Sequence, residues 1–134
     1  MFTTISLGVV QRLLRLAAVA LSIGLPLGLL VGGAQPIAVG LIPTPWDKLA
    51  HAAVFALLAA AIGHASGWHG RRVLAVAFVG ALAMGAMDEW HQMFLPGRSA
   101  GLDDLAADAV GAALGAGALL GRKRVKAWVL RHMG

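Results

Sequence analysis

The chain has 134 residues, of which 59% are hydrophobic and 13% are charged. Its mean hydropathy of +0.79 is higher than a soluble domain can solvate, which excludes a soluble globular enzyme and a disordered tail. There is no cysteine, so the chain has neither a disulfide bond nor a thiolate ligand or nucleophile. The composition indicates a membrane protein. The positions of the charged residues along the chain must then account for its formal net charge of +5.

Four apolar segments are long enough to cross the ~30 Å hydrocarbon layer, at residues 13–33, 49–66, 73–90 and 103–121. Because lipid offers the backbone no hydrogen-bond partner, each segment should be helical. We therefore predict an all-α fold, a membrane-embedded bundle of four transmembrane helices. Pro26 should kink the first of them.

The first segment also has an alternative interpretation as a signal peptide. Two arginines precede its apolar run, and Gly32, Gly33 and Ala34 would form a small-residue cleavage site. The run is long for such a peptide, which favours a retained helix. We expect three regions: the first helix with its flank at 1–34, a three-helix region at 35–121 and a basic tail at 122–134.

Basic residues flank one side of the four predicted spans far more often than the other. One side has two, Lys48 and Arg98, whereas the other has nine, namely Arg12, Arg15, Arg71, Arg72, Arg122, Lys123, Arg124, Lys126 and Arg131. Since positive flanks remain in the cytoplasm, we predict that both termini are cytoplasmic and that the protein lies in the inner (cytoplasmic) membrane. The basic residues then act as topological anchors, which argues against nucleic acid as a partner.

The acidic residues have the opposite distribution. All six lie where the second, third and fourth spans should meet the outer face, at Asp47, Asp88, Glu89, Asp103, Asp104 and Asp108. Acids at the start of a helix also suit the helix dipole, which is the simpler explanation of Asp103 and Asp104. Only fifteen residues, from Val73 to Met87, precede Asp88 in the third span, so Asp88 and Glu89 should sit at or within the membrane boundary. Acids at that depth are by default paired and functional.

Helical periodicity indicates which way the acids of the third span point. At ~100° per residue, Gly85, Glu89 and Gln92 share a narrow face, so Glu89 should point into the bundle beside a small residue that permits close helix contact. In the second span, Asp47 and His51 are four residues apart and share a face.

The fourth span carries an acidic stripe that continues into a glycine stripe. Asp104, Asp108, Gly111 and Gly115 fall on one side of the helix, and the two glycines form a small-xxx-small contact face. The same spacing recurs from Gly117 to Gly121. We predict that Asp108 is directed into a helix interface.

Between the third and fourth spans, Pro96 and Gly97 set a turn that should bring Arg98 back over the helix ends. A guanidinium binds a carboxylate or a phosphate bidentately, so two interpretations remain open. In the first, Arg98 forms a salt bridge with Glu89, Asp104 or Asp108 that pins the loop. In the second, an external anion competes for the same side chain.

These polar residues follow one spaced pattern. It reads Asp47-Lys48-x-x-His51, then Asp88-Glu89-x-x-Gln92-x-x-x-Pro96-Gly97-Arg98-Ser99-x-x-x-Asp103-Asp104-x-x-x-Asp108-x-x-Gly111-x-x-x-Gly115. Over about residues 45–121 this pattern resembles the VanZ-like family of small integral membrane proteins. The family takes its name from a protein associated with resistance to the glycopeptide teicoplanin, and its biochemical activity is generally unassigned.

What the resemblance implies for function is therefore limited to the polar positions that match, which are Asp47, Lys48, His51, Glu89, Gln92, Arg98, Asp104 and Asp108. Many members have Asn where this chain has Asp108, and often Asp where it has Gly101. The first departure adds a charge, which favours a metal or proton role, and the second removes one ligand. Both argue against transferring antibiotic resistance directly to this chain.

Three hypotheses about function follow. In the first, the polar pocket binds membrane lipids, specifically an anionic lipid-linked envelope intermediate, or a glycopeptide-like amphiphile. Arg98 and Lys48 would hold its phosphate, and Gln92 and His51 would bond its headgroup. Since two bases among six acids make a negative site, a bound cation would correct the balance. A monomer and a homo-oligomer both remain open.

The second hypothesis is a metal-dependent membrane enzyme acting on a lipid-linked phosphate. A divalent cation suits oxygen and nitrogen ligands, and the candidate ligands are His51, Glu89, Asp104 and Asp108. No recognised catalytic pattern such as His-Glu-x-x-His is present, so no catalytic residue is assigned. The third hypothesis is purely structural, with the polar cluster, Asp88 included, linking the helices through ion pairs.

Overall fold

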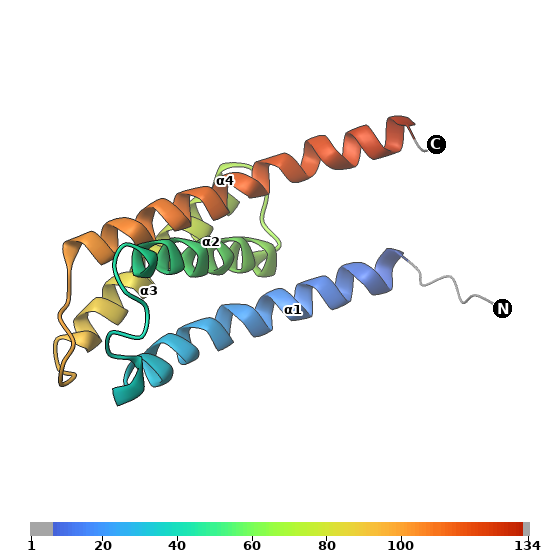
Figure 1. The fold of residues 1–134 in the computed structure, drawn as a ribbon. Helices are drawn as coiled ribbons and strands as arrows, with labels where there is room; N and C mark the ends of the chain where they lie inside the picture. Colours follow the sequence, from blue (N-terminus) through green and yellow to red (C-terminus); the bar gives the residue numbers. More distant parts are fainter. Residues whose placement is uncertain (1–6, 133–134) are drawn as a thin grey trace.

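The computed structural model describes residues 7–132, with the side chains of residues 7–121 and of Arg131. In chain order the elements are α1 (Leu7–Leu27), the π-helical turn η1 (Gly28–Gly32), the 3₁₀ turn η2 (Pro36–Ala38), α2 (Trp46–Ser66), α3 (Arg71–Gln92) and α4 (Leu102–His132) (Figure 1). Every regular element within this part of the chain is helical. The predicted all-α fold is confirmed.

Four of the described segments are long and apolar enough to cross a membrane: Leu7–Gly32, Trp46–Ser66, Arg71–Gln92 and Leu102–Gly121. Each contains or overlaps one predicted span, so the protein is a multi-pass membrane protein. The start of α1 and the end of α4 lie on the same side of the bundle, whereas their other ends lie opposite (Figure 1). Which side faces the cytoplasm remains a prediction.

The first and last helices are longer than their apolar segments indicate. α1 begins at Leu7 rather than residue 13, and α4 runs on to His132, through the predicted tail, whose side chains at 122–130 are outside the described set. The difference arises because hydropathy marks the part of a helix that lipid surrounds, and not where its hydrogen bonding ends. Pro26 lies inside α1, and the regular helix gives way two residues later to the π-helical turn η1.

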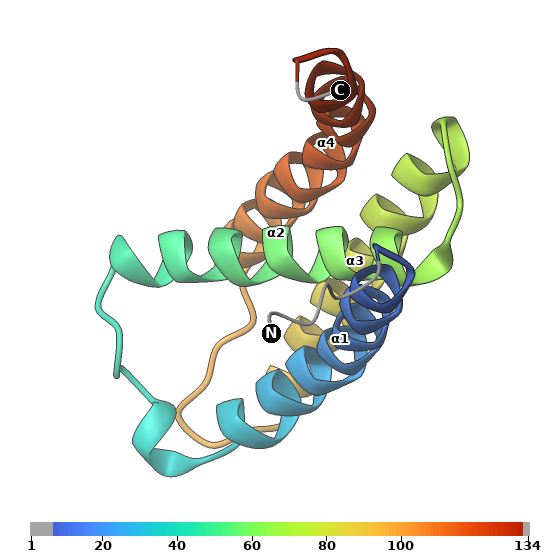
Figure 2. The same cartoon turned by 90° about the vertical axis from the view of Figure 1, so that its right-hand side faces the viewer.

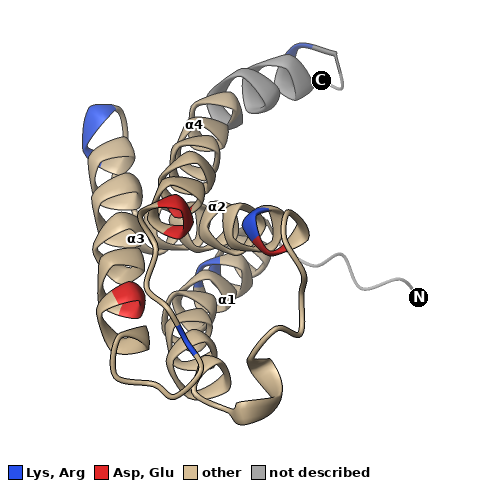
Figure 3. Cartoon of the chain, turned by 60° about the vertical axis from the view of Figure 1, so that its left-hand side comes forward, with Lys and Arg blue, Asp and Glu red and all other residues tan. Residues whose placement is uncertain are grey.

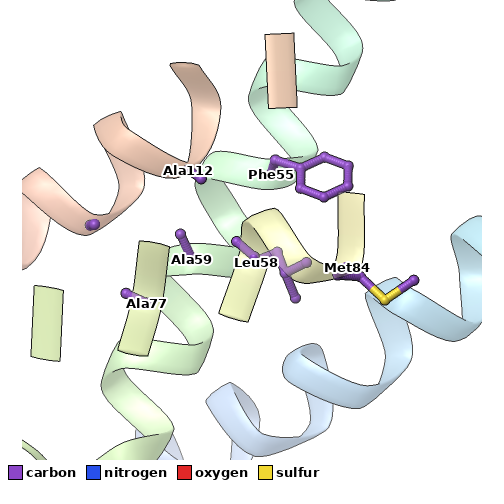
Figure 4. Close-up of a cluster of buried hydrophobic side chains, with 8 residues drawn as sticks. Phe55, Leu58, Ala59, Ala77, Met84 and Ala112 are labelled. Carbon is purple, nitrogen blue, oxygen red and sulfur yellow. The ribbon is translucent and has the colours of Figure 1, made fainter. Parts of the chain in front are cut away.

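Helix α2 lies at the centre and contacts α1, α3 and α4 (Figure 2). Phe55 and Leu58 of α2 are fully buried and pack against Met84 of α3 (Figure 4). The rest of this core is made of small residues, Ala59, Ala77, Ala81, Ala112 and Ala116. Such a core lets the helices approach closely, which is how helices associate where lipid removes the hydrophobic drive.

Glycines bring the backbone of α4 onto that of α2. A Cβ atom at Gly111 would overlap the backbone carbonyl of Ala52, and one at Gly115 would overlap that of Ala56. The predicted contact face is therefore confirmed. The same spacing from Gly117 to Gly121 makes no such contact, because nothing lies within 4 Å of a Cβ at either position. The contacts at Gly111 and Gly115 fix the position of α4 along the axis of α2, and with it the position of the first turn of α4 beside the start of α2.

Candidate functional site

The acidic residues gather at one end of the bundle, where α2 begins, α3 ends and α4 begins (Figure 3). We call this the acidic end. Arg71 and Arg72, at the start of α3, lie at the opposite end. The helix packing thus brings together side chains that are up to 61 residues apart, Asp47 and Asp108 being the extremes.

Lys48 joins the starts of α2 and α4. Its Nζ lies 3.3 Å from Asp47 and 2.9 Å from Asp103, and it also bonds Asp104 Oδ1. Asp47 accepts a further hydrogen bond of 3.2 Å from Thr44 Oγ1. The Lys48 ammonium is therefore surrounded by carboxylates of this chain.

His51 and Asp108 form the second link between α2 and α4. Nδ1 of His51 lies 2.9 Å from Oδ1 of Asp108, whose other oxygen is buried and has no hydrogen-bond partner. The ring of Phe55, one turn along α2, is nearly parallel to that of His51 at a centroid distance of 6.3 Å. A Cβ at Gly85 would come within 2.8 Å of Asp108 Oδ2, so only glycine leaves room for this carboxylate. Asp108 thus points into the bundle as predicted.

Glu89 holds the loop between α3 and α4. Its Oε2 accepts a 2.7 Å hydrogen bond from the backbone N–H of Gly101, whereas Oε1 is buried without a partner. Glu89 is buried, as its predicted face requires. On the same helix, Gln92 Nε2 donates to Asp88 Oδ2 at 2.9 Å, so these two buried side chains satisfy each other.

Three side chains from three helices converge in a geometry that fits a metal ion. His51 of α2, Glu89 of α3 and Asp108 of α4 each offer one ligand atom, and these atoms lie within 4.8 Å of one another. Asp104, the fourth candidate ligand in the sequence, is bonded to Lys48 instead. Asp47 and Asp88 also have other partners.

Among the described residues, Arg98 does not make the salt bridge to Glu89, Asp104 or Asp108 that was one of its two interpretations in the sequence. Leu95 to Arg98 form a turn closed by a 3.2 Å backbone hydrogen bond, with Gly97 at φ +74°. From this turn Arg98 donates a 3.0 Å hydrogen bond to the backbone carbonyl of Gly33, and its buried Nε has no partner. No described carboxylate pairs with it: Lys48 bonds Asp104, His51 bonds one oxygen of Asp108, and the Gly101 N–H bonds one oxygen of Glu89.

A cavity of about 680 Å³ opens at the acidic end. Two loop segments, 38–44 and 97–101, form much of its wall, together with the helix residues Asp47, Lys48, Ala50, His51, Gln92, Asp103 and Asp104. Arg98 is in the second segment. Another cavity, of about 650 Å³ and lined by Arg15, His64 and Trp68 among others, contains none of the predicted site residues.

Some contributors to the site were missed at the sequence level. The Gly101 N–H and the Gly33 carbonyl are backbone groups, which no residue pattern identifies. In the sequence, Phe55 cannot be distinguished from any other apolar core residue. Thr44 carried a signal, because it lies three residues before Asp47 at a helix start, where side-chain hydrogen bonds to the next turn are common.

Comparison with known proteins identifies the family of this chain. The family model VanZ/LLP1 matches residues 4–123, which include all four membrane segments and the whole acidic end. No curated protein and no solved structure matches the chain. Because the family match spans most of the chain, and not only the polar motif at 45–121, this four-helix membrane protein belongs to the VanZ/LLP1 family.

Proposed function

We propose that this protein binds the anionic headgroup of a cell-envelope lipid intermediate, or of a glycopeptide-like amphiphile, in the cavity at the acidic end. The cavity lies where three membrane helices end, which is the depth of a lipid headgroup. Its volume of about 680 Å³ falls in the range of small-ligand sites. The excess of basic residues at the other end places this cavity on the extracytoplasmic face in our proposal.

The observation that carries the proposal is the state of Arg98. Its guanidinium lies in the cavity wall with one hydrogen bond to a backbone carbonyl and a buried Nε that has no acceptor. A buried charged donor left unpaired is expensive, and a phosphate oxygen would satisfy it with bidentate geometry. Lys48 is less suited to direct contact than the sequence indicates, because three carboxylates already surround it.

A purely structural role accounts for only part of the cluster. The bonds of Lys48 to Asp47, Asp103 and Asp104 hold helix ends together and need no ligand. They leave the unpartnered Nε of Arg98 unexplained. A metal-dependent enzyme acting on the same lipid phosphate is the second candidate function, and the convergence of His51, Glu89 and Asp108 favours it.

The test is a titration of the full chain in nanodiscs of zwitterionic lipid. One arm uses a polyprenyl pyrophosphate and the other a teicoplanin-type glycopeptide, so that the arms separate the two ligand sources. We expect Arg98→Gln to weaken binding by at least about tenfold, as loss of a charge-assisted hydrogen bond requires.

Arg71→Gln is the matched control, because it removes the same charge from an exposed position at the opposite end. It should leave the affinity unchanged. Equal affinity of the Arg98→Gln protein and the wild type for both probes would refute the binding proposal. Phosphate release from the pyrophosphate probe, measured in the same samples, would establish the enzymatic alternative.

A further inference from the structure

We infer that His51, Glu89 and Asp108 form a binding site for a divalent transition-metal cation such as Zn²⁺ or Mn²⁺. The three residues come from α2, α3 and α4, and their ligand atoms lie within 4.8 Å of one another. The inference extends the proposed function, and it rests on that function only for the role of the cation toward a bound anion.

The burial of the two carboxylates is the first argument. Asp108 is 0% exposed and Glu89 is 7% exposed, and one oxygen of each has no hydrogen-bond partner. Ionised oxygens left unpaired among membrane helices are expensive, and they are retained where they bind something. These two lie with His51 in one cluster, which one cation satisfies together.

Charge balance is the second argument. Within the described part of the chain, Lys48 is held by Asp47, Asp103 and Asp104, and Arg98 is turned toward the carbonyl of Gly33. Neither base therefore neutralises Glu89 or Asp108. Metal ligation requires ionised carboxylates and a neutral imidazole, and such a ligand set carries two negative charges, which one divalent cation cancels.

The ligand set indicates the class of metal. Carboxylates alone would suit Mg²⁺ or Ca²⁺, but an imidazole nitrogen favours first-row transition ions. Two ligands each ~2.1 Å from one ion are at most ~4.2 Å apart, so the present spacing requires only small side-chain rotations. Phe55 and Gly101 already constrain His51 and Glu89 by ring stacking and a backbone hydrogen bond, as the outer shell of a metal site does.

A cation here would also explain how an anion enters an acidic cavity. Three protein ligands leave coordination positions open, as in sites that bind substrate or water at the metal. His51 and Arg98 both line the cavity, whereas Glu89 and Asp108 do not, so an ion held by the three ligands would lie at the inner edge of the cavity, beside His51. The ion and Arg98 would then attract a phosphate from two directions.

The experiment measures Zn²⁺ alone, with no anionic probe. The full chain is stripped with EDTA, reconstituted in zwitterionic nanodiscs and titrated calorimetrically, and the metal retained after gel filtration is counted by elemental mass spectrometry. We expect one Zn²⁺ per wild-type chain. Glu89→Gln and His51→Gln should each lower the affinity by at least about tenfold.

Asp103→Asn is the matched control. It removes a carboxylate from the same end of the bundle, and that side chain is exposed and outside the cluster. Its Zn²⁺ affinity should equal that of the wild type. Helical content is recorded for every variant, and if Glu89→Gln does not fold, the wild-type stoichiometry and His51→Gln decide.

Absence of stoichiometric Zn²⁺ in the wild type would overturn the inference. So would wild-type affinity in the folded Glu89→Gln or His51→Gln protein, or an equal loss in Asp103→Asn. Because no anion is present, a failure of Arg98-dependent anion binding would leave this result unaffected, and the two proposals fail separately.

Discussion

Nδ1 of His51 lies 2.9 Å from Oδ1 of Asp108, a contact that joins α2 to α4 across 57 residues of sequence. The same carboxylate keeps its other oxygen buried and unpartnered. Asp108 is thus half satisfied by a structural hydrogen bond and half available to a ligand. Glu89, bonded to the Gly101 N–H through only one oxygen, repeats this arrangement on α3.

Replacing Asp108 by Asn should separate stability from metal binding. Without metal, we expect the free energy of unfolding to be no lower than that of the wild type, because the variant removes a buried charge and keeps a hydrogen-bonding side chain. Zn²⁺ at a hundred times its Kd should stabilise the wild type by about 2.7 kcal/mol and the variant far less. Thermal unfolding in detergent, with EDTA and with Zn²⁺, measures both quantities. Equal stabilisation of the two proteins by Zn²⁺ would contradict the assignment of Asp108.

Gly111→Ala should destabilise the bundle. The added methyl group would overlap the backbone carbonyl of Ala52, which cannot rotate away, so we expect a loss of about 1–3 kcal/mol. Gly117→Ala is the control, since its methyl group meets nothing within 4 Å, and it should not destabilise the protein. Unfolding of both variants in the same detergent gives the comparison. A similar loss in the two would show that α4 does not pack on α2 through Gly111.

Lys48→Met should destabilise the acidic end through repulsion among Asp47, Asp103 and Asp104. We expect a loss of about 1 kcal/mol, typical of a partly exposed ion pair. The loss should shrink in about 1 M salt, where screening acts over ~3 Å. Lys48→Arg keeps the charge and should remain close to the wild type. Denaturation of both variants at low and high salt tests this. If Lys48→Met loses the same stability at both salt concentrations and Lys48→Arg loses as much, Lys48 has a packing role instead.

The orientation of the chain is testable with single cysteines, because the sequence contains none. Ser99 lies between α3 and α4 at the acidic end, and His69 lies between α2 and α3 at the other. In intact spheroplasts, a membrane-impermeant maleimide should label Ser99→Cys but not His69→Cys, and lysis should expose both. The reverse pattern would place the acidic end in the cytoplasm.

The fold and the gathering of charge could be predicted from the sequence, because both depend on local physics. Apolar runs of membrane length specify helices, and consecutive spans cross the membrane in alternating directions, which brings the start of α2, the end of α3 and the start of α4 to one side. Helical periodicity then orients Glu89 and Asp108 toward the interior. The structure agrees on each of these points.

The pairing of the polar groups could not be predicted in the same way. From the sequence, Arg98 could have paired with any of three carboxylates. Whether it pairs with one of them depends on the path of the loop at 93–101 and on the position of α4 along the axis of α2. The carbonyl that Arg98 contacts belongs to Gly33, whose side chain carries no polar signal. Gly117 and Gly121 make no such contact because helical periodicity puts them on another face of α4 from Gly111 and Gly115, although α2 still lies beside this part of α4, where Leu119 meets Gly63.

The central claim is that the acidic end binds an anion with the help of a cation held by His51, Glu89 and Asp108. The most direct test is the affinity of wild-type protein for a polyprenyl pyrophosphate, measured in zwitterionic nanodiscs with EDTA and with saturating Zn²⁺. Because the cation would offset the negative charge of the cavity, we predict that Zn²⁺ raises the affinity by at least about tenfold, and that Glu89→Gln removes this increase. An affinity that is the same with and without Zn²⁺ would contradict the account.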